Sequence, residues 1–375
     1  MRLIHMNSSI KQHLLMMPLK LDKTFDLELI EFSSYGFAVY ASDDLDRQNE
    51  YVSYGFNINY ESYVTSKFLP ILDKDPYYND QYALQMMEIE EAWTLTEGDP
   101  NYLIAIIDTG IDTDHPEFLD RISPLSYNVI TDTVGISAVE DSNGHGTGVA
   151  GVIGAIKDNS EGVAGIVQQS QLLIIKASEN DDPTTTDKDE SESFSDSNII
   201  KAINYASEKG ADIINLSLGG QGYNPSVQQA VTQAYENGSI IVAASGNDGN
   251  NQYMYPASYD NVISVGAVDD LEQIADYSNF NDKVDITAPG SEIVSTSNTG
   301  GYAISSGTSL AAPQVTAVIA LFQSYYPNFT DDQVISQIEL TAKDSGVVGY
   351  DVYYGHGIIQ AYQAMLLDPI TITFE

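Results

Sequence analysis

Short, continuous runs of apolar residues recur along the middle of the chain and alternate with stretches of helical periodicity. Such runs, which lack the polar-apolar alternation of a half-exposed strand, are typical of strands buried on both faces of a parallel sheet. Strands are predicted at residues 102–107, 172–176, 212–218, 239–244 and 262–268, and helices at residues 146–156, 197–209 and 225–237. The alternation predicts an α/β fold whose mostly parallel central sheet carries helices on both faces.

The composition excludes several classes of protein. The chain has 375 residues, of which 43% are hydrophobic, and this is enough for one large domain and a small one. No apolar stretch approaches the ~20 residues of a membrane span. Because the chain has no cysteine, disulfides, thiolate metal sites and a cysteine nucleophile are excluded.

The net charge of -39 argues against nucleic acid and anionic membranes as partners. A strongly acidic composition also fits a protein adapted to high salt, a protein that binds cationic ligands, or a surface whose charges are simply solvated. Residues 1–25 have a basic start but lack the apolar core and cleavage site of a secretory signal. A cytoplasmic protein is therefore expected, or a secreted one if its signal has already been removed.

The N-terminal part of the chain differs in pattern from the rest. Residues 35–40 alternate as a strand would, and a helix is predicted to open at Ser42. Two prolines and three charged residues at 69–76 indicate an exposed linker. We therefore expect a small α+β domain at residues 1–75, followed by a larger domain at residues 76–375.

Residues 305–323 combine a glycine-containing start with a helix that is apolar on almost every face. Such a helix is expected to run through the interior of a domain. Ser309 lies in its first turn, where unpaired main-chain N–H groups favour a developing negative charge. Pro313 cannot donate a hydrogen bond to the carbonyl of Ser309, four residues earlier. By itself the segment fits either a nucleophilic serine or an ordinary helix start.

Three other side chains supply the groups that a nucleophilic serine needs. A serine hydroxyl requires a histidine to take its proton, and that histidine requires a carboxylate to fix its tautomer. Asp108 follows the run at 102–107, and His145 lies between two glycines that allow close backbone approach. Asn247 follows the run at 239–244, where its amide can donate to the oxyanion of a tetrahedral intermediate.

From about Asp75 to Met365 the chain resembles the subtilisin-like serine proteases, the subtilases. The motifs that carry the resemblance are Asp108-Thr109-Gly110, His145-Gly146-Thr147, Asn247 and Gly307-Thr308-Ser309-Leu310-Ala311-Ala312-Pro313. The resemblance implies a subtilisin-like three-layer fold and a serine endopeptidase that works through an acyl-enzyme, with Asp108, His145, Ser309 and Asn247 as catalytic residues. The chain departs from the family's usual pattern at Gly148, where a second histidine is common, and at Leu310, where methionine is common.

The resemblance also implies where a substrate binds. Ser217-Leu218-Gly219-Gly220 matches the segment that pairs with the substrate backbone, and Met254 aligns near the floor of the first specificity pocket. Because Asp248 is close in sequence, this pocket is expected to take large apolar or basic residues. The segment 179–197 holds eight acidic residues and one lysine, borders the subsites upstream of the cut, and is expected to favour Lys or Arg there.

Calcium is common in the resembled family as a structural ion, whereas the chemistry itself requires no cofactor. Glu117 stands where a carboxylate ligand is expected. Asp158 lies in a segment, residues 157–162, that resembles the family's calcium loop. Lys157 in this loop is unfavourable beside a cation, so the segment fits either a calcium site or an altered loop without one.

Residues 1–75 resemble the family's inhibitory, chaperone-like prodomain, which the protease removes by cutting itself, here between Lys67 and Gln81. A permanent N-terminal module is the alternative. The predicted function is hydrolysis of a peptide or protein substrate by a monomeric serine endopeptidase. A dedicated maturation protease, such as a lantibiotic-type leader peptidase, is favoured over a broad degradative enzyme by the charged cleft segment. An inactive binding module is the remaining alternative, and the presence of all four chemical residues argues against it.

Overall fold

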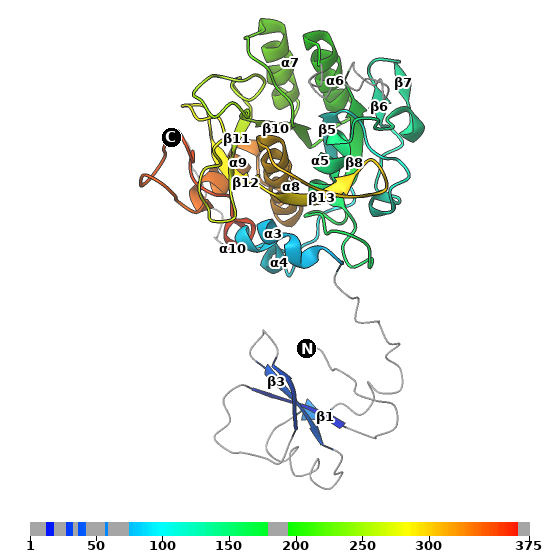
Figure 1. Cartoon of the computed structure of the whole chain (residues 1–375), viewed down its shortest axis with the longest axis vertical. Coiled ribbons are helices and arrows are strands. Elements are labelled where there is room, and N and C mark those ends of the chain that lie inside the picture. Colours follow the sequence, from blue (N-terminus) through cyan, green and yellow to red (C-terminus); the bar gives the residue numbers. More distant parts are fainter. Residues whose placement is uncertain are drawn as a thin grey trace. The chain divides into compact units, whose positions relative to one another are not determined.

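The chain divides into two compact units, residues 1–71 and residues 72–375. The computed structural model describes residues 75–178 and 194–366 in full, and in the first unit the backbone of four short strands (Figure 1). Each unit is described by itself. The predicted border at residue 75 stays a prediction, because residues 59–74 lie outside the described residues.

The first unit contains an antiparallel sheet with the strand order β2-β3-β1-β4. Its strands are β1 (His13–Pro18), β2 (Glu28–Phe32), β3 (Phe37–Ser42) and β4 (Asn57–Ile58). The strand predicted at residues 35–40 overlaps β3. The helix predicted to follow Ser42 lies outside the described residues.

The second unit is built on an eight-stranded sheet with the order β12-β11-β10-β9-β5-β8-β6-β7. All neighbouring strands run parallel except the edge pair β6 and β7. The strands are β5 (Leu103–Asp108), β6 (Tyr127–Asn128), β7 (Thr133–Val134), β8 (Gln171–Lys176), β9 (Ile213–Leu216), β10 (Ile240–Ala244), β11 (Ile263–Val268) and β12 (Ile286–Pro289). The five predicted strands are confirmed within a few residues.

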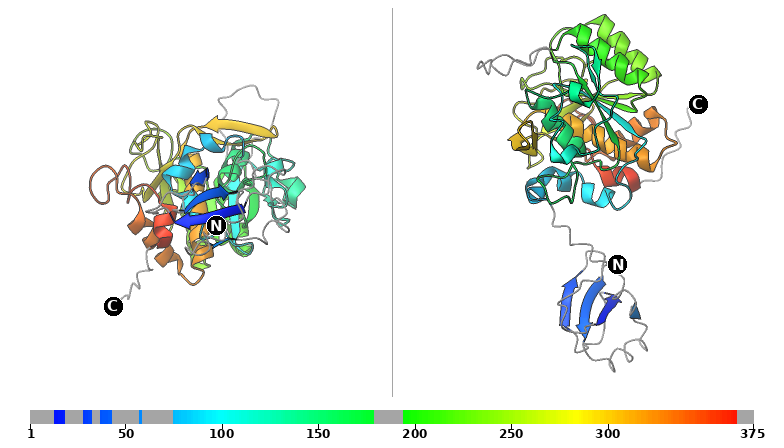
Figure 2. Two further views of the ribbon diagram at one scale, coloured as in Figure 1. Left: turned by 90° about the horizontal axis from the view of Figure 1, so that it is seen from below. Right: turned by 90° about the vertical axis from the view of Figure 1, so that its right-hand side faces the viewer.

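Helices cover both faces of this sheet, which confirms the predicted α/β class (Figures 1 and 2). Ile104 and Ile106 of β5 pack into one apolar core with α5 (His145–Gly154) and α8 (Thr308–Tyr325). The alternate residues Ala105 and Ile107 pack into a second core with α6 (Asp196–Glu208) and α7 (Pro225–Glu236). Because successive side chains point to opposite faces of a strand, a continuous apolar run is what two covered faces require.

Several further elements surround these layers. They are α3 (Tyr82–Met86), α4 (Ile89–Ala92), the hairpin of β13 (Ile293–Ser297) and β14 (Gly301–Ser305), α9 (Asp331–Thr341), α10 (Ala361–Leu366) and short 3-10 helices at Tyr78–Asp80, Pro116–Phe118 and Ile136–Ala138. The segment before Trp93 forms two short helices, α3 and α4, and not one continuous helix. Glu88 adopts a left-handed conformation, with φ of 57°, and interrupts the helical path between them.

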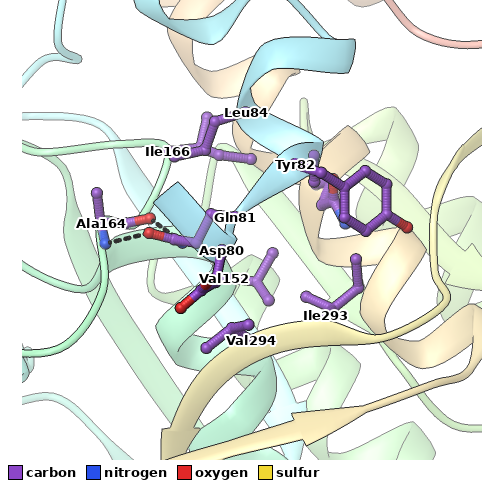
Figure 3. Close-up of a pocket in the computed structure, with 11 residues that line it drawn as sticks. Asp80, Gln81, Tyr82, Leu84, Val152, Ala164, Ile166, Ile293 and Val294 are labelled. Carbon is purple, nitrogen blue, oxygen red and sulfur yellow. Dashed lines mark hydrogen bonds between the residues drawn. The ribbon is translucent and has the colours of Figure 1, made fainter. Parts of the chain in front are cut away.

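The segment that enters the second unit is fastened beside α3. The side-chain amide of Gln81 exchanges two hydrogen bonds of 2.8 Å with the main chain of Ala164 (Figure 3). A small apolar pocket lies next to this contact, lined in part by Leu84, Val152 and Ile293. None of the four predicted catalytic residues lines it, so it belongs to the packing of the N-terminal segment. Across residues 75–178 and 194–366, no helix combines the length and apolarity needed to cross a bilayer.

Candidate active site

Ser309 is the second residue of α8, the predicted buried helix, and it follows Gly307. A side chain at Gly307 would place its Cβ 3.0 Å from Ser309 Oγ and 3.4 Å from Asn247 Nδ2. The hydroxyl and the amide therefore border the same small space, which stays open because residue 307 has no side chain. This is the space in which a reacting carbonyl could approach both groups.

Asn247 lies in the turn that follows β10, and its amide orientation is set by Thr308. The Asn247 Oδ1 atom accepts hydrogen bonds from the main-chain N–H of Thr308 at 2.9 Å and from the Thr308 hydroxyl at 2.8 Å. With the oxygen engaged in this way, the Nδ2 group is directed toward the space beside Ser309. The sequence analysis did not predict this role of Thr308. The position of Thr308 between Gly307 and Ser309 is the one feature of the sequence that could have indicated it.

Asp108 and His145 form the second pair of the site. Asp108 ends β5, is fully buried, and its Oδ1 atom lies 2.7 Å from His145 Nδ1. The same oxygen accepts the main-chain N–H of Thr109 at 2.7 Å. His145 begins α5, and a Cβ on Gly146 would lie only 2.3 Å from the carbonyl oxygen of Gly110. This contact bears out the expectation that a flanking glycine allows close approach.

Asp141 holds the loop before His145 in place, a role that sequence reasoning missed. Its buried carboxylate accepts hydrogen bonds from the N–H groups of Asn143 and Gly144 at 3.0 and 2.9 Å. It also accepts from the hydroxyl of Thr109, at the end of β5, and from the N–H and hydroxyl of Thr147 in α5, at 2.6–3.0 Å. A carboxylate with this many donors joins the strand that carries Asp108 to the helix that carries His145.

Both pairs lie at one edge of the central sheet. β10, β9 and β5 are neighbours that run parallel, so their carboxyl ends meet at the same edge. Asn247 follows β10, Asp108 ends β5, and Ser217 follows β9 between them. The Ser217 hydroxyl donates to the carbonyl oxygen of Ser309 at 2.8 Å, which ties the nucleophile's helix to the middle strand.

The predicted substrate-binding residues lie close to this edge of the sheet. Leu218 is buried, and Gly219 and Gly220 line an adjacent pocket. Gly220 exchanges two main-chain hydrogen bonds of 2.9 Å with Tyr255. Met254 lies against the turn that carries Asn247, because a Cβ on Gly246 would come within 2.6 Å of its Cγ. Residues 179–193 of the acidic segment lie outside the described residues.

The first predicted metal ligand, Glu117, is fully buried. Its carboxylate accepts hydrogen bonds from Asn159 Nδ2 at 2.8 Å, the Tyr302 hydroxyl at 3.0 Å and the main-chain N–H of Val163 at 3.1 Å. Burial raises the pKa of Glu117, and these donors act in the opposite direction. The carboxylate thus has protein partners without a metal ion.

The second predicted ligand, Asp158, pairs with its neighbour Lys157 at 3.1 Å. The main chain of this loop, residues 157–162, is bound by a different carboxylate, that of Asp75. Asp75 is buried and accepts hydrogen bonds from the main-chain N–H groups of residues 158–160 at 2.9–3.2 Å. Burial raises the pKa of Asp75 as well. In the described part of the chain, no three acidic or histidine side chains come together as a metal site.

Comparison with known proteins agrees with this geometry. The model of the subtilase family matches residues 99–357. The chain is 38% identical to a thermophilic serine proteinase of Bacillus sp. (strain AK1), covering 78% of this chain and 68% of that protein. It is 36% identical to thermitase of Thermoactinomyces vulgaris, covering 78% of this chain and 98% of thermitase. A crystal structure of a lanthipeptide protease superposes with a TM-score of 0.66 at 26% identity, covering 76% of this chain and 93% of that one.

Proposed function

The chain belongs to the subtilase family and is a serine endopeptidase, and we propose that Asp108, His145 and Ser309 are its catalytic triad. The observation that carries this proposal is the arrangement of two pairs at one sheet edge. Asp108 holds His145 at 2.7 Å, while Ser309 Oγ and Asn247 Nδ2 border a common space. No other set of residues in the described chain combines a histidine-bound carboxylate with such a serine.

In the proposed reaction, His145 takes the proton of Ser309 Oγ through Nε2, because its Nδ1 atom faces Asp108. The serine oxygen forms a bond to the scissile carbonyl carbon, and the carbonyl oxygen becomes an oxyanion. Asn247 Nδ2 and the main-chain N–H of Ser309 donate to that oxyanion. His145 then gives the proton to the leaving amine, an acyl-enzyme remains, and water releases the acyl group by the reverse proton transfers.

The test is Ser309→Ala. We expect kcat to fall on the order of 10⁶, the magnitude known for the serine of subtilisin, with a small residual rate from binding and the oxyanion hole. A serine-directed phosphonate should label the wild type and not the variant. If the variant kept more than about a tenth of the wild-type rate, far above this expectation, the assignment of the nucleophile would be wrong.

We further propose that the enzyme is made as a zymogen whose residues 1–75 are an inhibitory prodomain. The division of the chain near this point and the separate antiparallel sheet of the first unit support the proposal. Intact mass distinguishes it from a permanent module. Wild type should lose a fragment that ends between Lys67 and Gln81, whereas Ser309→Ala should keep its full mass.

We propose that the substrate is a peptide precursor with basic residues upstream of the cut, cleaved in a dedicated maturation step. The acidity of segment 179–197 and the structural similarity to a lanthipeptide protease support this over broad degradation. A random peptide library, analysed by mass spectrometry, separates the two. A maturation protease should cut few sequences, whereas a degradative enzyme should cut many.

We also propose that a structural calcium ion binds at Asp75 and Glu117, two buried carboxylates that contact the same loop at Asn159. Such an ion would add stability and take no part in the proton transfers. Asp158 would join only if its pair with Lys157 opened. Calcium added after chelation should raise the melting temperature of wild type but not of Glu117→Gln, and an equal effect on both would rule out this site.

A further inference from the structure

The stretch that enters the second unit, residues 75–86, is folded into turns and short helices from its first residue. Tyr78–Asp80 form a 3-10 helix, and α3 begins at Tyr82. The N–H of Tyr78 donates to the carbonyl oxygen of Asp75 at 2.9 Å, so the first turn begins at Asp75 itself. A protease, by contrast, binds its substrate as an extended strand. Residues 75–86 must therefore unfold locally before any of their peptide bonds can be cut.

Asp75 fastens the beginning of this stretch, and it is only 2% exposed. Its Oδ2 atom accepts the main-chain N–H of Asp158 at 2.9 Å, and its Oδ1 atom accepts those of Asn159 and Ser160 at 3.1 and 3.2 Å. Hydrogen bonds to a charged acceptor are roughly twice as strong as those between neutral groups. One side chain thus ties the first residue of the stretch to a loop that is distant in the sequence.

The loop that Asp75 binds is itself held in place. The Asn159 side chain donates to the buried carboxylate of Glu117 at 2.8 Å. At the other end of the loop, the carbonyl oxygen of Gly162 accepts the main-chain N–H of Tyr77 at 2.8 Å. Asp75 is therefore bound to a part of the second unit that has its own fixed contacts, and the bond at Tyr77 adds to its hold.

The rest of the stretch is held by side chains that reach other segments. Gln81 exchanges its two hydrogen bonds with the main chain of Ala164 (Figure 3). The Tyr82 hydroxyl donates to the carbonyl oxygen of Ser291 at 2.7 Å. Leu84 packs into the apolar core that α5 and α8 share. The stretch thus supports the two helices that carry the proposed catalytic histidine and serine.

We propose that Asp75 sets the end point of self-processing, so that the protease cuts before Asp75 and leaves residues 75–86 intact. The inference rests on the proposed zymogen and narrows its cleavage range, because residues 75–81 are excluded as cutting sites. A cut among them would require the carboxylate to give up its three donors and the turns to open. Ending the process at this point also preserves the packing of the stretch against α5 and α8 in the mature enzyme.

The first test is the intact mass of the self-processed wild type. We expect a mature chain whose first residue is Asp75 or an earlier one, with no species that starts at residues 76–82. A mature chain that starts at any of residues 76–82 would overturn the proposal.

The second test asks whether Asp75 itself protects the stretch. Full-length Ser309→Ala, which should not cut itself, is digested with a limiting amount of proteinase K in EDTA, so that the proposed calcium ion makes no contribution. Cuts should fall before Asp75 and not within residues 75–81. Adding Asp75→Asn keeps the shape of the side chain but turns one acceptor into a donor that faces an N–H group. New N-termini within residues 75–81, followed by mass spectrometry, should then form about tenfold faster.

Asp80→Asn, also in the Ser309→Ala chain, is the matched control. Asp80 lies in the same stretch, is exposed, and its loss changes the net charge equally, so cleavage should stay within about twofold of the Ser309→Ala rate. Circular dichroism checks the folding of each variant. Equal rates for the chains with and without Asp75→Asn would show that Asp75 does not set the end point.

The two tests separate this inference from the zymogen proposal. If the wild type keeps its full mass, self-processing is wrong, whereas digestion with the added protease still shows whether the chain resists cleavage from Asp75 onward. If Asp75→Asn fails to fold, the digestion of Ser309→Ala alone decides, because cuts within residues 75–81 of that chain would contradict the inference.

Discussion

The two edges of the central sheet use aspartate for different purposes. At the carboxyl edge, Asp108 is the last residue of β5 and binds His145. At the amino edge, Asp212 stands immediately before β9 and accepts the N–H of Leu103 at 2.6 Å. Asp285 stands immediately before β12 and accepts the N–H of Ser264 at 2.8 Å.

The difference follows from the polarity of parallel strands. Main-chain N–H groups at the amino ends need acceptors, and a carboxylate is a good one, so an aspartate there completes the sheet. An aspartate at the carboxyl edge meets carbonyl oxygens and must find another donor. In this protein the donors to Asp108 are the imidazole of His145 and the main-chain N–H of the next residue, Thr109. Direction along the strand therefore separates a structural acid from one available for chemistry.

Among the variants that compare the two edges, the largest effect is expected from Asp108→Asn. The change removes the charge that stabilises a protonated His145 and favours the wrong tautomer, so kcat should fall by about 10⁴. Asp212→Asn, at the opposite edge, is the matched control and should keep nearly full activity. Comparable activity losses in the two variants, measured on one peptide with folding checked by circular dichroism, would break the distinction between the edges.

Asn247→Ala should have the next largest effect. It removes a donor to the oxyanion while leaving the triad in place, so we expect kcat to fall by about 10²–10³ with little change in KM. Thr308→Val, which removes one of the two hydrogen bonds that orient the Asn247 amide, should cost less. A change confined to KM would indicate that Asn247 binds the substrate and does not stabilise the transition state.

The smallest effect on activity, and a clear effect on stability, is expected at the amino edge. Burial raises the pKa of Asp285 from 3.8 to about 6, with nearby Glu339 acting in the same direction and His356 and Lys283 opposing it. Between these values the folded state keeps a proton that the unfolded state has lost. The free energy of unfolding should therefore fall as pH rises through this window, by up to about 3 kcal/mol.

Asp285→Asn cannot ionise, and its side-chain oxygen can still accept the N–H of Ser264. The variant should lack this contribution and should be more stable than wild type above pH 6, with equal activity. The contribution of Asp285 is measured by urea unfolding of wild type and variant at pH 4 and pH 7. The difference between the two proteins at each pH removes the contributions of the other titrating groups. An identical pH dependence of the two proteins would show that Asp285 is not responsible.

Much of the fold was open to prediction because burial on two faces leaves a direct trace in the sequence. The run at 102–107 and its counterparts are apolar at consecutive positions, and all five correspond to strands. The elements that were missed leave weaker traces. β12 begins after Asp285 and includes Thr287 and Pro289, and the helix before Trp93 breaks at Glu88, where no glycine or proline signals an interruption.

The features of the candidate site also fall into those that the sequence predicts and those that only the tertiary structure shows. By itself the sequence determined the layered α/β fold and the family, and it indicated the four residues that we propose for the chemistry, because each of these depends on residue types within short segments. Only the tertiary structure decided that Asp141 holds the histidine loop, that Thr308 orients Asn247, that Ser217 replaces the hydrogen bond Pro313 cannot make, and that Asp75 binds the loop at residues 158–160. These contacts join segments that are separated in the chain, and no local pattern specifies them, because they arise only when the sheet brings the strand ends together.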